Sequence, residues 1–122
     1  MGRIFYGATS FNGDVSEWDL SSVNNLAMDY MFWGAVSFDH NISKWNTSRV
    51  YGMSKMFYGA AQFNGDISRW DVSSVRTMDS LFAGATSFNS NITKWKTSSV
   101  TIMDGMFDKA KCFNQNLFNW NV

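Results

Sequence analysis

Large apolar residues recur along the chain with a fixed phase. Tryptophan and two sets of phenylalanines repeat together: Trp18, Trp45, Trp70, Trp95 and Trp120; Phe5, Phe32, Phe57, Phe82 and Phe107; Phe11, Phe38, Phe63, Phe88 and Phe113. The spacing is 27 residues once and 25 thereafter, because two extra residues lie between Val23 and Met28. A period of this length indicates structural units that are stable only when stacked on one another. We therefore expect a single domain, residues 1–122, with unit boundaries near residues 15, 42, 67, 92 and 117.

Within each unit, the apolar spacing predicts a strand followed by a helix. Ile67, Trp70 and Val72 have the spacing of a leucine-rich-repeat strand, in which alternate residues point inward. Residues 75–85 place their apolar side chains on one face of a short helix, and Gly84 lies where such a helix would end. The predicted fold class is an α/β repeat, a leucine-rich-repeat-like solenoid of about five 25-residue strand-turn-helix coils.

The composition narrows the function classes. The chain has 122 residues, ten Lys and Arg, ten Asp and Glu, one His and one Cys. Zero net charge argues against nucleic acid or an anionic membrane as the partner. A single His and a single Cys leave no disulfide, Cys/His zinc cluster or familiar catalytic constellation. The uncharged aromatic stretch 30–38 is too short for a transmembrane segment. We expect no enzyme, no cofactor and no metal.

One repeat motif points to a known family. The string M-F-x-G-A-x-x-F-N-x-[DN]-I-[ST]-x-W-[DN]-x-S-x-V-x-x-M, seen at Met56–Met78, resembles the bacterial surface protein 26-residue repeat. That repeat is grouped with BspA-like leucine-rich-repeat surface proteins, and the resemblance extends over the whole chain. It implies an adhesion or interaction module of largely unknown role, at the cell surface or outside the cell, with no catalytic residues.

A first candidate site is aromatic. The residue after the phenylalanine of the predicted helix is Tyr6, Trp33 and Tyr58 in the first three units, and the aromatic character then stops. Tyr30, three residues before Trp33, is expected to join them on the same helix face. Such a patch suits a protein partner, a sugar ring or another flat ligand. Alternatively, these rings only shield a packing groove.

A second candidate site is basic. Lys44, Arg69, Lys94 and Lys96 fall on the polar positions of successive predicted strands. A strip of this kind suits an acidic partner, although a solvated strand face interleaved with Asp accounts for it as well. A third feature, two turn columns rich in Asn and Asp, could supply oxygen ligands for Ca²⁺. Hydrogen bonds from these side chains to turn backbone account for them more simply.

These observations predict a non-catalytic repeat scaffold for protein–protein or surface recognition and adhesion. Its partner-binding residues are expected in the aromatic and basic sites. The alternative is a structural subunit that docks into a larger multi-protein assembly through its ends. Met1 is in phase with a methionine column and Val122 falls within a unit, without the polar caps that close repeat arrays. We therefore expect a longer array, or ends covered by neighbouring repeats or assembly subunits.

Overall fold

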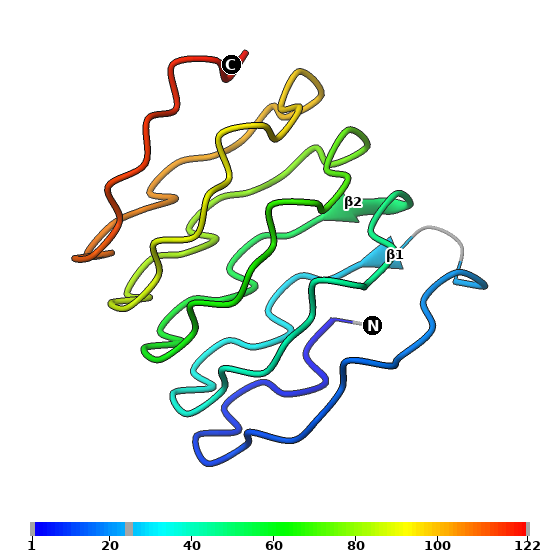
Figure 1. The fold of residues 1–122 in the computed structure, drawn as a ribbon, viewed down its shortest axis with the longest axis vertical. Coiled ribbons are helices and arrows are strands. Elements are labelled where there is room, and N and C mark those ends of the chain that lie inside the picture. The colour runs from blue at the N-terminus through cyan, green and yellow to red at the C-terminus, as the bar shows by residue number, and fades with distance from the viewer. Residues whose placement is uncertain (1, 24–25, 122) are drawn as a thin grey trace.

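The chain winds as a stack of irregular coils. The computed structural model describes residues 2–23 and 26–121. Figure 1 shows successive passes of the chain lying side by side, from the blue N-terminal coil to the red C-terminal one. We use "coil" for one such repeat of the chain. Met1, Val122 and part of the two-residue insertion lie outside the described residues.

Regular secondary structure is confined to one narrow ladder. Strand β1, Leu26–Ala27, pairs in parallel with strand β2, Val50–Gly52, with Leu26 opposite Val50. Isolated parallel bridges from Gly52 to Thr77 and from Thr77 to Ile102 continue the ladder across the later coils. Residues 2–23 and 26–121 contain no helix, and therefore none that could span a membrane. The predicted leucine-rich-repeat-like solenoid of strand-turn-helix coils is wrong.

The predicted helix at residues 75–85 is replaced by consecutive tight turns. Ser80 and Gly84 have φ of 52° and 70°, in the left-handed region, which interrupts any right-handed helix. Successive backbone N–H groups donate alternately to a carbonyl of their own coil and to a carbonyl of the next coil. Leu81 donates to the carbonyl of Met78 within its own coil, at 3.2 Å, whereas Phe82 donates to Met106 of the next coil, at 2.9 Å. The bonds from residue i to i−4 that define a helix are therefore not formed.

The predicted strand at residues 67–72 also adopts turns. The Trp70 N–H donates to the Ile67 carbonyl at 3.1 Å, which closes a turn within the coil. Asp71 accepts the backbone N–H of Ser73 at 3.0 Å, which turns the chain again. The β-ladder instead passes through Thr77, a few residues later, where the backbone is free to pair with the neighbouring coils.

The repeated apolar columns fill the centre of the stack. The Trp rings of successive coils are parallel, with centroids 6.3 Å apart between Trp45 and Trp70. Within a coil the two phenylalanines also stack, as Phe57 and Phe63 do at 4.1 Å. The fully buried phenylalanines are Phe32, Phe38, Phe57, Phe63, Phe82 and Phe88. The core is therefore a bundle of aromatic ladders that runs the length of the stack and leaves the turns at its surface.

Candidate recognition surfaces

Three aromatic rings form a ladder on the surface of the first three coils. Tyr6 stacks on Trp33 with centroids 4.6 Å apart and ring planes 9° apart. Trp33 stacks in turn on Tyr58 at 5.7 Å and 8°. The next coil has Ala83 at this position, and its small side chain is buried. The structure therefore brings Tyr6, Trp33 and Tyr58 together, as the sequence predicts.

Tyr30 belongs to the same surface by a different route from the one expected. Because residues 28–35 form turns and not a helix, its ring lies 6.3 Å from Tyr6 and tilted by 50°. The Arg3 guanidinium lies 4.9 Å from the Tyr30 ring centroid, and the Lys55 ammonium lies 5.5 Å from it. These residues occupy the same position in coils one and three, so one tyrosine has cations from both neighbouring coils.

We call this surface the aromatic ridge: Arg3, Tyr6, Tyr30, Trp33, Lys55 and Tyr58. Sequence reasoning missed its two cations because their column shares no side-chain type. The column of Arg3, Tyr30 and Lys55 is instead united by backbone conformation, with φ of 70°, 61° and 55°. The cations come close to the Tyr30 ring because the coils that carry them stack on either side of it.

Both faces of the central ring of the ridge, Trp33, are covered by neighbouring rings. Tyr6 and Tyr58 cover the two faces of Trp33, while Tyr6 is 48% exposed and Tyr58 is 39% exposed. A sugar that binds by lying flat on the Trp33 ring would have to displace a neighbour in the stack. The groups left to a partner are ring edges, tyrosine hydroxyls and the Arg3 cation, which favours a protein surface over a flat ligand.

The basic residues divide into two groups. Lys44 pairs with Glu17 of the preceding coil at 3.7 Å, and both side chains are largely exposed, so the pair contributes little stability. Arg69, Lys94 and Lys96 line a hollow of about 310 Å³ between neighbouring coils. Within the described part of the chain, none of these three forms an ion pair. We call Arg69, Lys94 and Lys96 the basic groove.

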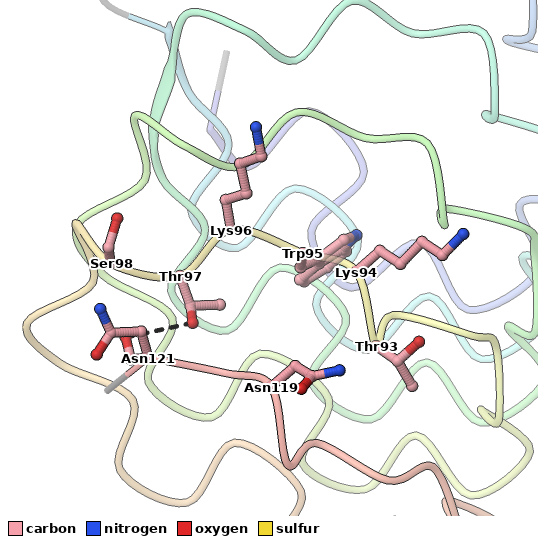
Figure 2. Close-up of a pocket in the computed structure, with 8 residues that line it drawn as sticks. All are labelled: Thr93, Lys94, Trp95, Lys96, Thr97, Ser98, Asn119 and Asn121. Atoms are coloured by element: carbon pink, nitrogen blue, oxygen red, sulfur yellow. Dashed lines mark hydrogen bonds between the residues drawn. The ribbon is translucent and has the colours of Figure 1, made fainter.

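The two lysines of the basic groove point toward one side of their coil. A second hollow, of about 390 Å³, is lined by both lysines together with Asn119 and Asn121 of the next coil. Figure 2 shows the ammonium groups of Lys94 and Lys96 directed away from these two asparagines. The Ser73 hydroxyl and backbone N–H lower the pKa of Asp71, with a smaller contribution from the Lys96 charge. Asp71 therefore stays ionised and moderates the positive potential of the groove.

The Asn and Asp turn columns form hydrogen-bond ladders. Asn12 accepts the backbone N–H of Asp39 at 3.0 Å, and Asn64 accepts that of Asn89 at 2.8 Å, each across neighbouring coils. In the other turn column, each Asp or Asn side chain accepts the backbone N–H of the residue two positions later, as Asp14 does from Ser16 at 2.9 Å. Among residues 2–23 and 26–121, no three His, Cys, Asp or Glu side chains are grouped as a metal site requires. The turn oxygens therefore serve the backbone.

The architecture and its surfaces define a repeat protein with aromatic-cored, stacked coils. The family described as "Mycoplasma protein of unknown function, DUF285" matches residues 1–72 and again residues 27–122, and together these matches cover the chain. The chain belongs to this family. No curated protein and no solved structure matches the sequence.

Proposed function

We propose that this chain is a non-catalytic repeat scaffold that recognises a protein partner through the aromatic ridge. The observation that carries the proposal is the stack of Tyr6, Trp33 and Tyr58 beside the cations of Arg3 and Lys55. Tyrosine, tryptophan and arginine are the residues most often found at the energetic centre of protein interfaces. Rings already ordered by stacking lose little further side-chain entropy when a partner binds.

The basic groove supports an acidic segment on that partner. Arg69 and Lys94 occupy the same position in neighbouring coils, where like charges repel each other across the stack. A carboxylate between them would relieve this repulsion. Lys44 belongs to the same strip but already faces Glu17, so it is assigned the smaller part in binding.

The setting of this recognition is proposed from the repeat motif. Its likeness to BspA-like surface proteins supports a role in adhesion or recognition at a cell surface. Recognition of this kind needs no cofactor and no catalytic group, and the presence of only one His and one Cys in the sequence is in keeping with it.

Peptide selection followed by calorimetry tests the proposal. A displayed random-peptide library is selected on the immobilised chain, and the enriched peptides are titrated into the wild type and into Trp33→Ser/Tyr58→Ser. We expect the double variant to lose at least tenfold in affinity, about 1.4 kcal/mol or more, because two interface rings are removed. We also expect the enriched peptides to be acidic.

A matched variant makes the result specific. Tyr51 is 45% exposed and lies outside the ridge, so Tyr51→Ser should bind the same peptides as tightly as the wild type. Unchanged binding by the double variant, or equal loss in Tyr51→Ser, would refute recognition through the aromatic ridge.

A further inference from the structure

The hollow of the basic groove recurs one coil later in the stack. It is lined by residues 68–73 of one coil together with Lys94 and Lys96 of the next. The hollow of about 390 Å³ is lined by residues 93–98 together with Asn119 and Asn121, each 25 positions further along the chain. Equivalent residues of successive coils therefore form the two hollows, which makes the hollow a feature of coil geometry and not of one local sequence.

The two hollows differ in charge. The next coil contributes Lys94 and Lys96 to the basic groove, but it contributes two asparagines at the equivalent positions of the second hollow. Figure 2 shows the ammonium groups of both lysines directed away from those asparagines, so the lysines contribute mainly their apolar stems there. We call this second hollow, lined by residues 93–98 with Asn119 and Asn121, the neutral hollow.

The buried side chains of the neutral hollow offer carbon atoms to a partner. Trp95 and Thr97 are both buried, and each uses its polar hydrogen elsewhere. The Trp95 Nε1–H donates to the Ile67 carbonyl at 3.0 Å, and the Thr97 hydroxyl donates to the Asn121 carbonyl at 3.4 Å. An apolar side chain that fills the hollow therefore displaces water without leaving these groups unpaired.

The tryptophan column measures the separation of coils on this face, because each tryptophan lies between two exposed residues that edge the hollows. The rings of Trp45 and Trp70 have centroids 6.3 Å apart. Those of Trp95 and Trp120 are 6.2 Å apart. In an extended chain, side chains i and i+2 lie on the same face, about 6.6–6.8 Å apart. An extended segment that runs along the stack can therefore place two such side chains in neighbouring hollows.

Charge determines which hollow takes an acidic side chain. Arg69 and Lys94 are equivalent residues of neighbouring coils, and both attract a carboxylate that lies between them. On the same face, the first coil has Glu17 and Asp19, which repel an acidic segment. The face is therefore complementary to a carboxylate at the third and fourth coils, next to the neutral hollow of the fourth and fifth.

We propose that an extended segment of a protein partner lies along the stack, with an acidic residue in the basic groove and an apolar residue two positions away in the neutral hollow. This inference rests on the acidic segment of the proposed function, to which it adds the conformation, the second residue type and the spacing. It does not depend on the aromatic ridge, and either part of the recognition surface can fail while the other stands.

Two short peptides of identical composition test the spacing. Leu-Ser-Glu-Ser-Leu places Glu and both Leu side chains on one face, whichever way the peptide runs along the stack. Ser-Leu-Glu-Leu-Ser places both Leu side chains on the opposite face from Glu. With both peptide ends blocked, each is titrated into the isotope-labelled whole chain and followed by NMR. We expect the first peptide to bind at least fivefold more tightly and to shift the amide signals of Trp95 and Asn119.

Three single variants identify the hollows. Arg69→Gln removes a cation from the basic groove and should weaken both peptides at least threefold. Asn119→Lys puts a cation at the neutral hollow, in the position that Lys94 has in the basic groove, and should abolish the preference for the first peptide. Lys111→Gln removes an exposed cation that lines neither hollow and should bind both peptides as the wild type does.

Four results would overturn this inference: no binding of either peptide, equal binding of both to the wild type, an unchanged preference in Asn119→Lys, or equal weakening by Arg69→Gln and Lys111→Gln. Circular dichroism checks that each variant is folded, and if one is not, the two wild-type titrations decide. Trp33→Ser/Tyr58→Ser should retain the preference for the first peptide. Loss of library-selected peptides by that double variant therefore tests the aromatic ridge separately from the two hollows.

Discussion

From Trp45 onward, the coil tryptophans make two kinds of contact with the coil before them, as Trp70 illustrates. The Trp70 ring is buried and stacks on Trp45, and its Nε1–H donates to the Ile42 carbonyl at 3.0 Å. This bond satisfies the one polar atom of a large apolar side chain, so the ring can be buried completely at no polar cost. Because residues 67–72 form no strand, this side-chain hydrogen bond links them to the preceding coil in place of backbone pairing.

Truncation of Trp70 should therefore be severe. Trp70→Ala removes the ring and the hydrogen bond, at a cost of about 3–5 kcal/mol, which is comparable with the whole stability of many small domains. Trp70→Phe retains a ring and should cost about 1–3 kcal/mol. Urea unfolding followed by circular dichroism measures both. Trp120 is only half-buried in the last coil, so Trp120→Phe should cost less than Trp70→Phe. An equal loss of stability at both sites would contradict this explanation.

Acid should weaken the turns held by Asp71. The Ser73 hydroxyl and N–H stabilise the Asp71 carboxylate and lower its pKa in the folded chain. Because the folded-state pKa lies below the unfolded one, this stabilisation is present above the ordinary Asp pKa of about 3.9 and is lost as pH falls through the lowered value.

The variant Asp71→Asn isolates this contribution to acid unfolding. Asn46 occupies the equivalent position and accepts the Ser48 N–H at 3.2 Å, so an amide is compatible with the same turn. Below pH 4, the free energy of unfolding of Asp71→Asn should fall less steeply with decreasing pH than that of the wild type. Urea titrations at a series of pH values measure this slope. Identical slopes would show that the Asp71 carboxylate does not contribute.

At the scale of the element, the consecutive turns at residues 75–85 and at the equivalent residues of the other coils depend on two left-handed positions per coil. We call these turns the turn segment. Gly84 has φ of 70°, and a Cβ added there would meet only ordinary contacts, the nearest being Gly59 Cα and N at 3.5 Å. Position 84 therefore favours glycine because of its backbone conformation and not because a side chain lacks space. Ser80, four residues earlier, has φ of 52° without the freedom of glycine.

Substitutions at these two positions should have opposite signs. Gly84→Ala forces a side chain into the left-handed region and should destabilise by about 1–2 kcal/mol. Ser80→Gly relieves that cost but adds freedom to the unfolded chain, for a net gain of about 0.5–1 kcal/mol. Thermal unfolding measures both. Ser87→Gly, where φ is not positive, should only destabilise, and a gain there would remove the conformational explanation.

The same segment explains which elements the sequence could predict. Gly84, interpreted from the sequence as the end of a helix, has the left-handed conformation typical of such a glycine, but no helix precedes it. The column of Tyr30, Lys55 and Ser80 has no common side chain, so its positive φ left no signal. The periodic spacing of apolar residues in this segment is compatible with a helix. It is equally compatible with turns in which every second N–H donates to a carbonyl of the next coil.

At the scale of the whole molecule, the repeat phase carried more information than the secondary structure. It identified the buried Trp and Phe columns, and it aligned Tyr6, Trp33 and Tyr58 without any knowledge of the backbone. It could not identify the Arg3 and Lys55 contacts, which depend on where each side chain leaves its turn. The phase does place Glu17 in the same column as Lys44, but the ion pair that separates Lys44 from the basic groove is established by the structure.

The ring ladders also determine the shape of any longer stack. Equivalent rings of neighbouring coils are 6.3 Å apart for Trp45 and Trp70 but 5.5 Å apart for Phe32 and Phe57, and hydrogen-bonded strands are about 4.8 Å apart. A pure translation would move every point by the same distance, so each coil must also be rotated relative to its neighbour. Accumulated over successive coils, this rotation bends or twists the stack. Surfaces on distant coils then face in different directions, and a rigid partner can contact only a few consecutive coils at once.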